Sequence, residues 1–425
     1  MNGFTELNPQ RLSMKHTLCR VAFAVLSLSA AVASAEVVRV AVIDPASGPF
    51  AAPSLNWTKS MQLAAELIGR EKLAGDNKLE FTQFDNKGST QESIVLLRSA
   101  IDQGYRYVVN GGSSSVYAAL VDAINKHNER NPGKEVMIMT HSVADPEITN
   151  GKCSFWSFRF VPNADMYAEA MTSEIAKDES IKKVYIVGQN YPLGQSISKA
   201  TREYLKRKRP DIEIVGDDLH PMGQVKDFSP YIAKIRASGA DAVTTANWGQ
   251  DLTLLVKAAN DAQLRTRFYT YYAHSFGAPS ALGKAAEGRV KNLNVYSPNN
   301  DGFVGREMVE GMNKNYNEDF IIASTYTLVR GLAEGMRKAH STDPVKVAEA
   351  LEGAKFADLN GESEMRKSDH QLQTSMFITS WVPLNGKDIR YGQESSGYGW
   401  KIDRRIEPYV ASRPTSCQMV RPGSR

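Results

Sequence analysis

Cysteine and histidine are scarce in this chain, which has three cysteines and seven histidines among 425 residues. The histidines show no spacing typical of a metal site, and no Gly-x-Gly-x-x-Gly follows an apolar run, which argues against a dinucleotide site. The sequence also lacks the Gly-x-Ser-x-Gly of a nucleophile elbow. We therefore expect no metal, no cofactor and no catalytic residues, and we do not expect an enzyme.

An excess of charge of one sign is also missing. The formal net charge is +4, and it falls to +2 without the first 35 residues, which hold three basic residues and one acidic residue. A charge this small argues against nucleic acid or a membrane surface as the partner.

Long apolar runs are absent except for residues 21–32, which are too few to span a bilayer. A basic flank precedes this run, and the small residues Ala33-Ser34-Ala35 follow it. This order is typical of a signal peptide. We therefore predict an exported protein that is cleaved after Ala35 and does not insert into the membrane, with translation starting at Met1 or Met14.

Only two cysteines, Cys153 and Cys417, follow the predicted cleavage site. Because disulfides persist in exported proteins, two cysteines in such a chain predict one disulfide. Two unpaired thiols are the alternative.

Short apolar strands alternate with amphipathic helices from Glu36 onward. Residues 37–43 are expected to form a strand and residues 89–103 a helix, with apolar residues spaced to face one side. Four such strand–helix units precede residue 146, and a second series covers residues 163–274. Repeated units of this kind predict an α/β protein with two doubly wound parallel sheets. After residue 296 we expect mainly helices, one strand at 376–382, and an irregular end over the last twenty-five residues.

Serines lie where three of the predicted strands end, at Ser47, Ser113 and Ser142. Doubly wound sheets bind ligands at the carboxyl ends of their strands. The most informative of these loops is Asn110-Gly-Gly-Ser-Ser-Ser-Val-Tyr117, which joins a buried strand to a helix. Unpaired N–H groups and the positive end of the helix dipole favour an anion there, such as a carboxylate. The alternative is that Ser113 or Ser114 only caps the helix.

Four segments, in their order and spacing, resemble the solute-binding proteins of ABC transporters in the leucine/isoleucine/valine-binding class. They are Ser47–Ala51, Gly112–Ser115, Ala144–Thr149 and Gly188–Gly194. The resemblance covers nearly all of the chain after the signal peptide. It implies the type I periplasmic-binding fold, in which two lobes are joined by three crossovers and close on a ligand by a hinge. It also implies a periplasmic monomer that delivers a small-molecule ligand to an ABC permease.

The resemblance places the crossovers near Ser157, Lys291 and Thr374. Residues 36–157 and 292–374 would then form the first lobe, and residues 158–291 and 375–405 the second. Residues 1–35 would be the signal peptide, and residues 406–425 a C-terminal tail.

Two positions match the family's ligand contacts. The carboxylate-binding serine of the family corresponds to Ser113, and Ser142 matches a position that contributes its backbone carbonyl. Two positions depart from the family, because a threonine that helps to bind the amino acid is Ala144 here and a tyrosine of the first loop is Pro53.

The second lobe departs further. The family's tyrosine there is replaced by Leu193, although Tyr191 is nearby. The acidic residue that pairs with the ligand ammonium should fall close to Ala273 or His274, and neither is acidic. A buried ammonium needs an anionic or carbonyl partner.

Aromatic and neutral side chains gather where that acid is missing, which favours a small organic or aromatic acid over an amino acid. A branched-chain amino acid stays the alternative, with Asp251 as a substitute acid, and a ligand-sensing module that docks on a receptor is a second alternative. The ligand-binding residues that we predict are Ser47, Phe50, Ser113, Ser114, Ser142, Ala144, Tyr191, Trp248, Tyr272 and His274, with Trp57 as a further candidate.

Overall fold

The computed structural model describes residues 1, 3–4, 36–359 and 361–423. The predicted signal peptide and its cleavage site lie outside these residues. Residues 36–423 belong to one compact unit. Among the described residues, no helix is both long and apolar enough to cross a membrane.

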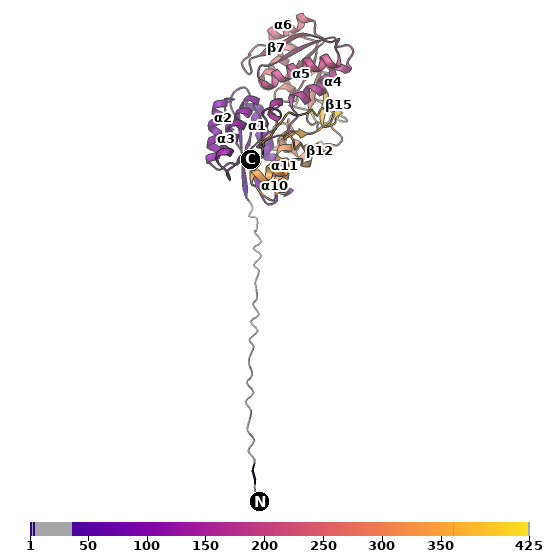
Figure 1. Cartoon of the computed structure of the whole chain (residues 1–425). Helices are drawn as coiled ribbons and strands as arrows, with labels where there is room; N and C mark the ends of the chain where they lie inside the picture. The colour runs from indigo at the N-terminus through magenta and orange to yellow at the C-terminus, as the bar shows by residue number, and fades with distance from the viewer. Residues whose placement is uncertain (2, 5–35, 360, 424–425) are drawn as a thin grey trace. The chain divides into compact units, whose positions relative to one another are not determined.

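The first sheet consists of five parallel strands in the order β2-β1-β3-β4-β5, and Figure 1 shows its helices α1, α2 and α3 together. The strands are β1 (Val37–Asp44), β2 (Lys78–Asp85), β3 (Tyr107–Val109), β4 (Met137–Thr140) and β5 (Ser157–Arg159). The helices are α1 (Ala51–Arg70), α2 (Thr90–Asp102) and α3 (Ser114–Arg130).

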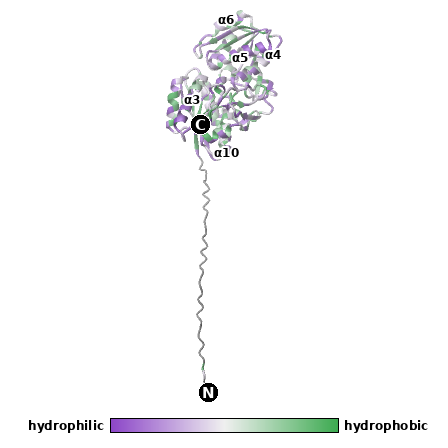
Figure 2. Cartoon of the chain, viewed as in Figure 1, coloured by the Kyte–Doolittle hydropathy of each residue, from purple (hydrophilic) through white to green (hydrophobic). Residues whose placement is uncertain are grey.

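Both faces of this sheet are covered by helices, which explains why residues 40–43 of β1 are all apolar. Val40 and Val42 point into a core shared with α1, whereas Ala41 and Ile43 point into a core shared with α2 and α3. Alternate residues of a strand face opposite sides, so a strand buried on both faces reads as a continuous apolar run. Figure 2 shows hydrophobic and hydrophilic residues mixed along the helices, as expected for elements with one buried side.

The second sheet has seven strands in the order β15-β14-β10-β9-β8-β6-β7. Its strands are β6 (Lys183–Gln189), β7 (Glu213–His220), β8 (Ala242–Thr245), β9 (Arg267–Thr270), β10 (Val290–Asn294), β14 (Met376–Pro383) and β15 (Tyr398–Ile406). Its helices are α4 (Ala164–Lys177), α5 (Pro192–Lys208), α6 (Ser229–Ser238), α7 (Gly249–Asp261) and the short α8 (Ala278–Leu282). The predicted fold class, with its two doubly wound sheets, is confirmed.

Two features of the second half differ from the expectation. β14 and β15 pair antiparallel and extend the second sheet, so that the first residues of the segment expected to be irregular form a strand. A small antiparallel sheet of β11 (Lys355–Asp358), β12 (Gly361–Met365) and β13 (Leu372–Gln373) also lies in a region where no strand was predicted. These strands are short and partly polar, so they show no clear alternation of apolar and polar residues and were not predicted. Their formation depends on pairing with the neighbouring strands.

The helices after residue 296 return to the core of the first sheet. They are α9 (Arg306–Tyr316), α10 (Ser324–Ala339) and α11 (Pro344–Leu351). Met312 and Leu332 pack in the same cluster as Val40 and Met61. Two turns of 3-10 helix, Pro146–Thr149 and Lys284–Ala286, complete the described elements.

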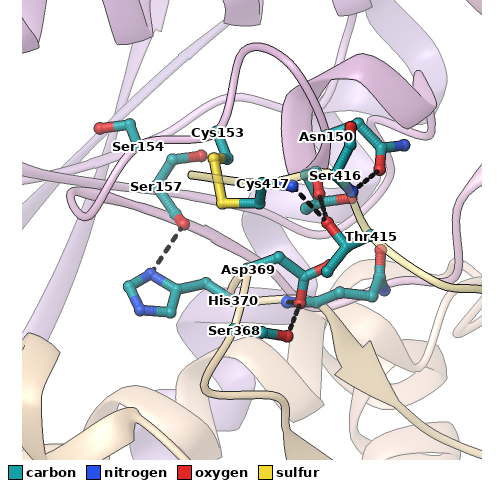
Figure 3. Close-up of a disulfide and its surroundings, with 12 residues drawn as sticks. Asn150, Cys153, Ser154, Ser157, Ser368, Asp369, His370, Thr415, Ser416 and Cys417 are labelled. Carbon is teal, nitrogen blue, oxygen red and sulfur yellow. Dashed lines mark hydrogen bonds between the residues drawn. A yellow bond between two sulfur atoms is a disulfide. The ribbon is translucent and has the colours of Figure 1, made fainter. Parts of the chain in front are cut away.

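A disulfide joins Cys153 to Cys417, with 5.6 Å between the Cα atoms, so the predicted pairing is confirmed. Figure 3 shows the C-terminal segment beside residues 150–157, where the N–H of Ser416 donates to Oδ1 of Asn150. In the same segment Arg413 forms an ion pair with Glu169 of α4. The tail is therefore attached to α4 at one point and, through the disulfide, to the loop before β5.

Candidate ligand-binding site

The loop between β3 and α3 brings Ser113 to the start of a helix. Ser113 has an extended backbone (φ −161°, ψ 132°), but its side chain makes no capping hydrogen bond. The alternative in which Ser113 serves only as a cap is therefore unsupported. The N–H groups of the first turn have no partner within the helix, so these donors and the Ser113 hydroxyl lie together at the positive end of α3.

Asp44, the last residue of β1, fixes the shape of this loop. Its buried carboxylate accepts hydrogen bonds from the N–H of Gly111 (2.9 Å), the N–H of Gly112 (2.7 Å) and Nδ2 of Asn110 (2.7 Å). Burial raises the pKa of Asp44 to about 7, although the two glycine N–H groups act in the opposite direction. The N–H groups of Gly111 and Gly112 are thus used by Asp44, which leaves those at the start of α3 for a ligand.

The two glycines of the loop are required by close packing. A Cβ atom on Gly111 would lie 2.5 Å from the ring of His141, and one on Gly112 would lie 2.8 Å from Cδ of Pro45. Burial lowers the pKa of His141 to about 3, so the ring beside the loop is neutral at physiological pH.

Aromatic residues follow three strands of the second sheet. Tyr191 follows β6, Trp248 follows β8 and Tyr272 follows β9. The indole N–H of Trp248 donates to the hydroxyl oxygen of Tyr191 at 2.9 Å. The Trp248 ring also lies 4.4 Å from the ring of Phe50, measured between centroids.

These two groups of residues line one cavity, which has about 460 Å³ of empty space out to its open mouth. The described lining residues carry no carboxylate, ammonium or guanidinium group, and four of them are Trp or Tyr. They are Trp57, Gly111, Gly112, Ser113, Ser114, Ser142, Val143, Tyr191, Leu193, Trp248, Tyr272, His274, Ser275, Ile321 and Ile322.

His274 lies in the cavity wall near the position where the family's acid was expected. Its Nδ1 is 3.0 Å from Nδ2 of Asn292, and burial lowers its pKa to about 4. The ring is therefore a neutral group at physiological pH. Asp251, the suggested substitute acid, does not line the cavity, because its Oδ2 accepts from Gln189 and from the N–H of Gly223, each at 2.8 Å.

Seven of the ten predicted ligand-binding residues line the cavity: Ser113, Ser114, Ser142, Tyr191, Trp248, Tyr272 and His274. The other three lie elsewhere. Phe50 packs behind Trp248, and Ser47 borders a neighbouring hollow together with Phe50. Ala144 is buried, and its carbonyl accepts from the N–H of Ala164 at 2.7 Å.

The prediction missed several wall residues. Val143 and Ser275 are chain neighbours of predicted residues and were within reach of the same reasoning. Ile321 and Ile322 come from the segment before α10, far along the chain, and no local pattern marked them. Ser142 also stabilises the loop between β3 and α3, because its hydroxyl donates a hydrogen bond to the carbonyl of Gly111 at 2.7 Å.

The described residues provide no candidate metal site. Across the residues that the structure describes, no group of three or more His, Cys, Asp and Glu side chains could hold a metal ion.

Comparison with known proteins identifies the family. A family model described as periplasmic binding protein matches residues 37–388. The chain belongs to the periplasmic binding protein family. It is 30% identical to the Leu/Ile/Val-binding protein homolog 4 of Brucella abortus (strain 2308) over 95% of this chain and 98% of the relative.

Solved structures show the same fold. A leucine-, isoleucine-, valine-, threonine- and alanine-binding protein from Brucella ovis, in a closed conformation, has a TM-score of 0.79 at 27% identity, covering 91% of this chain and all of that one. A solute-binding protein of R. palustris in complex with benzoate has a TM-score of 0.77 at 18% identity, covering 90% of this chain and 99% of that one.

Membership in this family establishes several of the expected properties. The protein is a periplasmic solute-binding protein of an ABC transporter, so that it binds a small molecule, works with a permease and is not an enzyme. The family resemblance read from the sequence is confirmed.

Replacing Ser113 by alanine is expected to weaken ligand binding by about 1.5–3 kcal/mol, which is roughly 10- to 150-fold in Kd, because it removes one charge-assisted hydrogen bond. Titration calorimetry measures the change. Ser115→Ala is the matched control, since Ser115 is exposed on the same helix and does not line the cavity. Equal affinity of Ser113→Ala and wild type would exclude Ser113 as a ligand contact.

Proposed function

We propose that this solute-binding protein captures a small aromatic carboxylic acid and passes it to its permease. The proposal is based on the described cavity wall, which has no charged side chain. The wall brings aromatic rings together with the N-terminal end of α3. The carboxylate would bind at Ser113 and the first-turn N–H groups, and the ring would lie among the aromatic side chains.

The lack of an anionic side chain in the described wall argues against an amino acid as the ligand. An α-ammonium loses its water on entering the cavity and needs an anionic or carbonyl partner. His274 is neutral, and Asp251 is held by Gln189 and Gly223 outside the wall. This fold is shared by relatives named for leucine, isoleucine and valine and by a structural relative in complex with benzoate. Because the fold accommodates both ligand classes, the ligand class has to be inferred from the residues of the cavity wall.

Hinge closure accounts for how such a ligand would be held. The cavity takes residues from loops that follow strands of both sheets, and a rotation of one sheet relative to the other would open it. The lobe boundaries given above, cleavage after Ala35 and a monomeric state are parts of this proposal.

A panel of ligands tests the proposed class. By titration calorimetry we expect benzoate or a hydroxycinnamate to bind, and leucine and valine to bind at least about 10-fold more weakly, because burying an unpaired ammonium costs more than one lost hydrogen bond. Tight binding of leucine with no response to either aromatic acid would contradict the proposal and favour the branched-chain amino acid alternative.

A further inference from the structure

The Tyr272 hydroxyl in the cavity wall is buried without a partner among the described residues. A buried hydroxyl without a partner is costly, so its retention in a ligand cavity calls for an explanation. The hydroxyl of Tyr191 differs, because it already accepts from Trp248.

The hydrogen bonds of the neighbouring His274 fix which of its ring nitrogens carries the proton. The N–H of Ala273 donates to Oδ1 of Asn292 at 2.8 Å. This contact fixes the orientation of the Asn292 amide, because an N–H donor requires an oxygen acceptor. The other amide atom, Nδ2, therefore lies beside Nδ1 of His274. Because Nδ2 can only donate, Nδ1 must accept and carries no proton. The proton of the neutral ring is therefore on Nε2, which makes no hydrogen bond with any residue that the structure describes.

We propose that Tyr272 and His274 form a subsite for a hydroxyl group on the ring of the ligand, at a place distinct from the carboxylate site of Ser113. This inference rests on the proposed function and specifies its ligand as a hydroxylated aromatic acid. The two side chains belong to one loop, with ring centroids 6.5 Å apart, whereas Ser113 comes from the other sheet.

The chemistry of the two groups selects a hydroxyl over other substituents. Nε2–H of His274 can only donate, whereas the Tyr272 hydroxyl can also accept. A phenolic hydroxyl accepts from the first and donates to the second, and so satisfies both. A methoxy group can only accept, and a second carboxylate would be buried without a cation, since the described wall holds none.

Paired ligands test the subsite by calorimetry. Wild-type protein should bind the para-hydroxylated acid about 10-fold more tightly than benzoate, which corresponds to one or two added hydrogen bonds. In Tyr272→Phe this preference, measured as the ratio of the two affinities in the same variant, should fall to about threefold or less. Tyr271→Phe is the control, because Tyr271 is the preceding buried tyrosine and does not line the cavity; it should keep the full preference.

The outcomes separate this inference from the proposed function. Benzoate binding without any gain from the hydroxyl in wild-type protein would overturn the subsite alone. A preference that survives in Tyr272→Phe would also overturn it. Binding of leucine without binding of either aromatic acid would overturn both the subsite and the proposed ligand class.

Discussion

Replacing Asp44 by alanine is expected to destabilise the protein strongly and to weaken ligand binding by about 10-fold or more. The substitution leaves two buried donors, the N–H groups of Gly111 and Gly112, without an acceptor, whereas Nδ2 of Asn110 loses one of its two acceptors and keeps the carbonyl of Ile43. Each unpaired buried donor costs roughly 1–3 kcal/mol, so the loss of both should lower the free energy of unfolding by about 2–6 kcal/mol. Binding falls because these hydrogen bonds hold the loop that presents Ser113.

Chemical denaturation measures the first effect and calorimetry the second. Asp122→Ala is the control, because Asp122 is exposed on α3 and its nearest cation, Lys126, is 3.9 Å away. We expect this control to match wild type within about 0.5 kcal/mol. Wild-type stability and affinity in Asp44→Ala would contradict the structural role given to Asp44.

Asp44 should also give stability a pH dependence of defined sign. Its pKa is raised from 3.8 to about 7 in the folded protein, so between these values the folded state holds a proton that the unfolded state has released. The contribution of Asp44 is therefore greatest below pH 4 and is lost as the pH rises through 7. Relative to Asp44→Asn, which does not titrate, wild-type protein should lose stability over this interval. A flat difference between the two proteins would contradict the raised pKa.

Removing the disulfide is the second change with a large expected effect. In Cys153→Ser/Cys417→Ser the free energy of unfolding should fall by roughly 3–5 kcal/mol, because the bond closes a loop of 264 residues and so restricts the unfolded chain. The folded tail keeps other contacts, among them the hydrogen bond from Thr415 Oγ1 to the carbonyl of Thr149 at 2.6 Å. The variant should therefore fold at low denaturant concentration.

Urea denaturation of oxidised wild type, reduced wild type and the double variant checks this expectation. Reduced wild type and the double variant should unfold at the same lower midpoint, since both lack the covalent bond. Intact mass after alkylation of the unreduced, exported protein provides the chemical control. Two alkylated cysteines in that sample would refute the disulfide.

The binding loops were predictable because their signals are local. Glycines followed by serines, placed between an apolar strand and a helix, are enough to indicate an anion-binding turn, and Tyr191, Trp248 and Tyr272 were found by the same strand-end rule. Asp44 was missed although it directly follows the first predicted strand. Its partners lie more than sixty residues away, so that no sequence spacing connects them.

The rest of the site depends on tertiary packing. Ile321 and Ile322 reach the cavity because the segment before α10 returns to the first sheet, which hydrophobic periodicity does not specify. Ala144 stands at a family contact position where the family has threonine, and its carbonyl accepts a hydrogen bond from the N–H of Ala164. β15 could have been found from the alternation of Trp400, Ile402 and Ile406.

We expect the cavity to accept a carboxylate without an ammonium beside it, and two pairs of matched ligands measure this preference. Isocaproate is leucine without its ammonium group, and hydrocinnamate is phenylalanine without its ammonium group, so each pair keeps the carboxylate and the apolar part constant. By calorimetry, each deaminated acid should bind at least about 10-fold more tightly than its amino acid, because the described wall offers the ammonium no anionic partner. Tighter binding of leucine than of isocaproate would contradict the account and require an ammonium acceptor, such as the carbonyl of Ser142, inside the cavity.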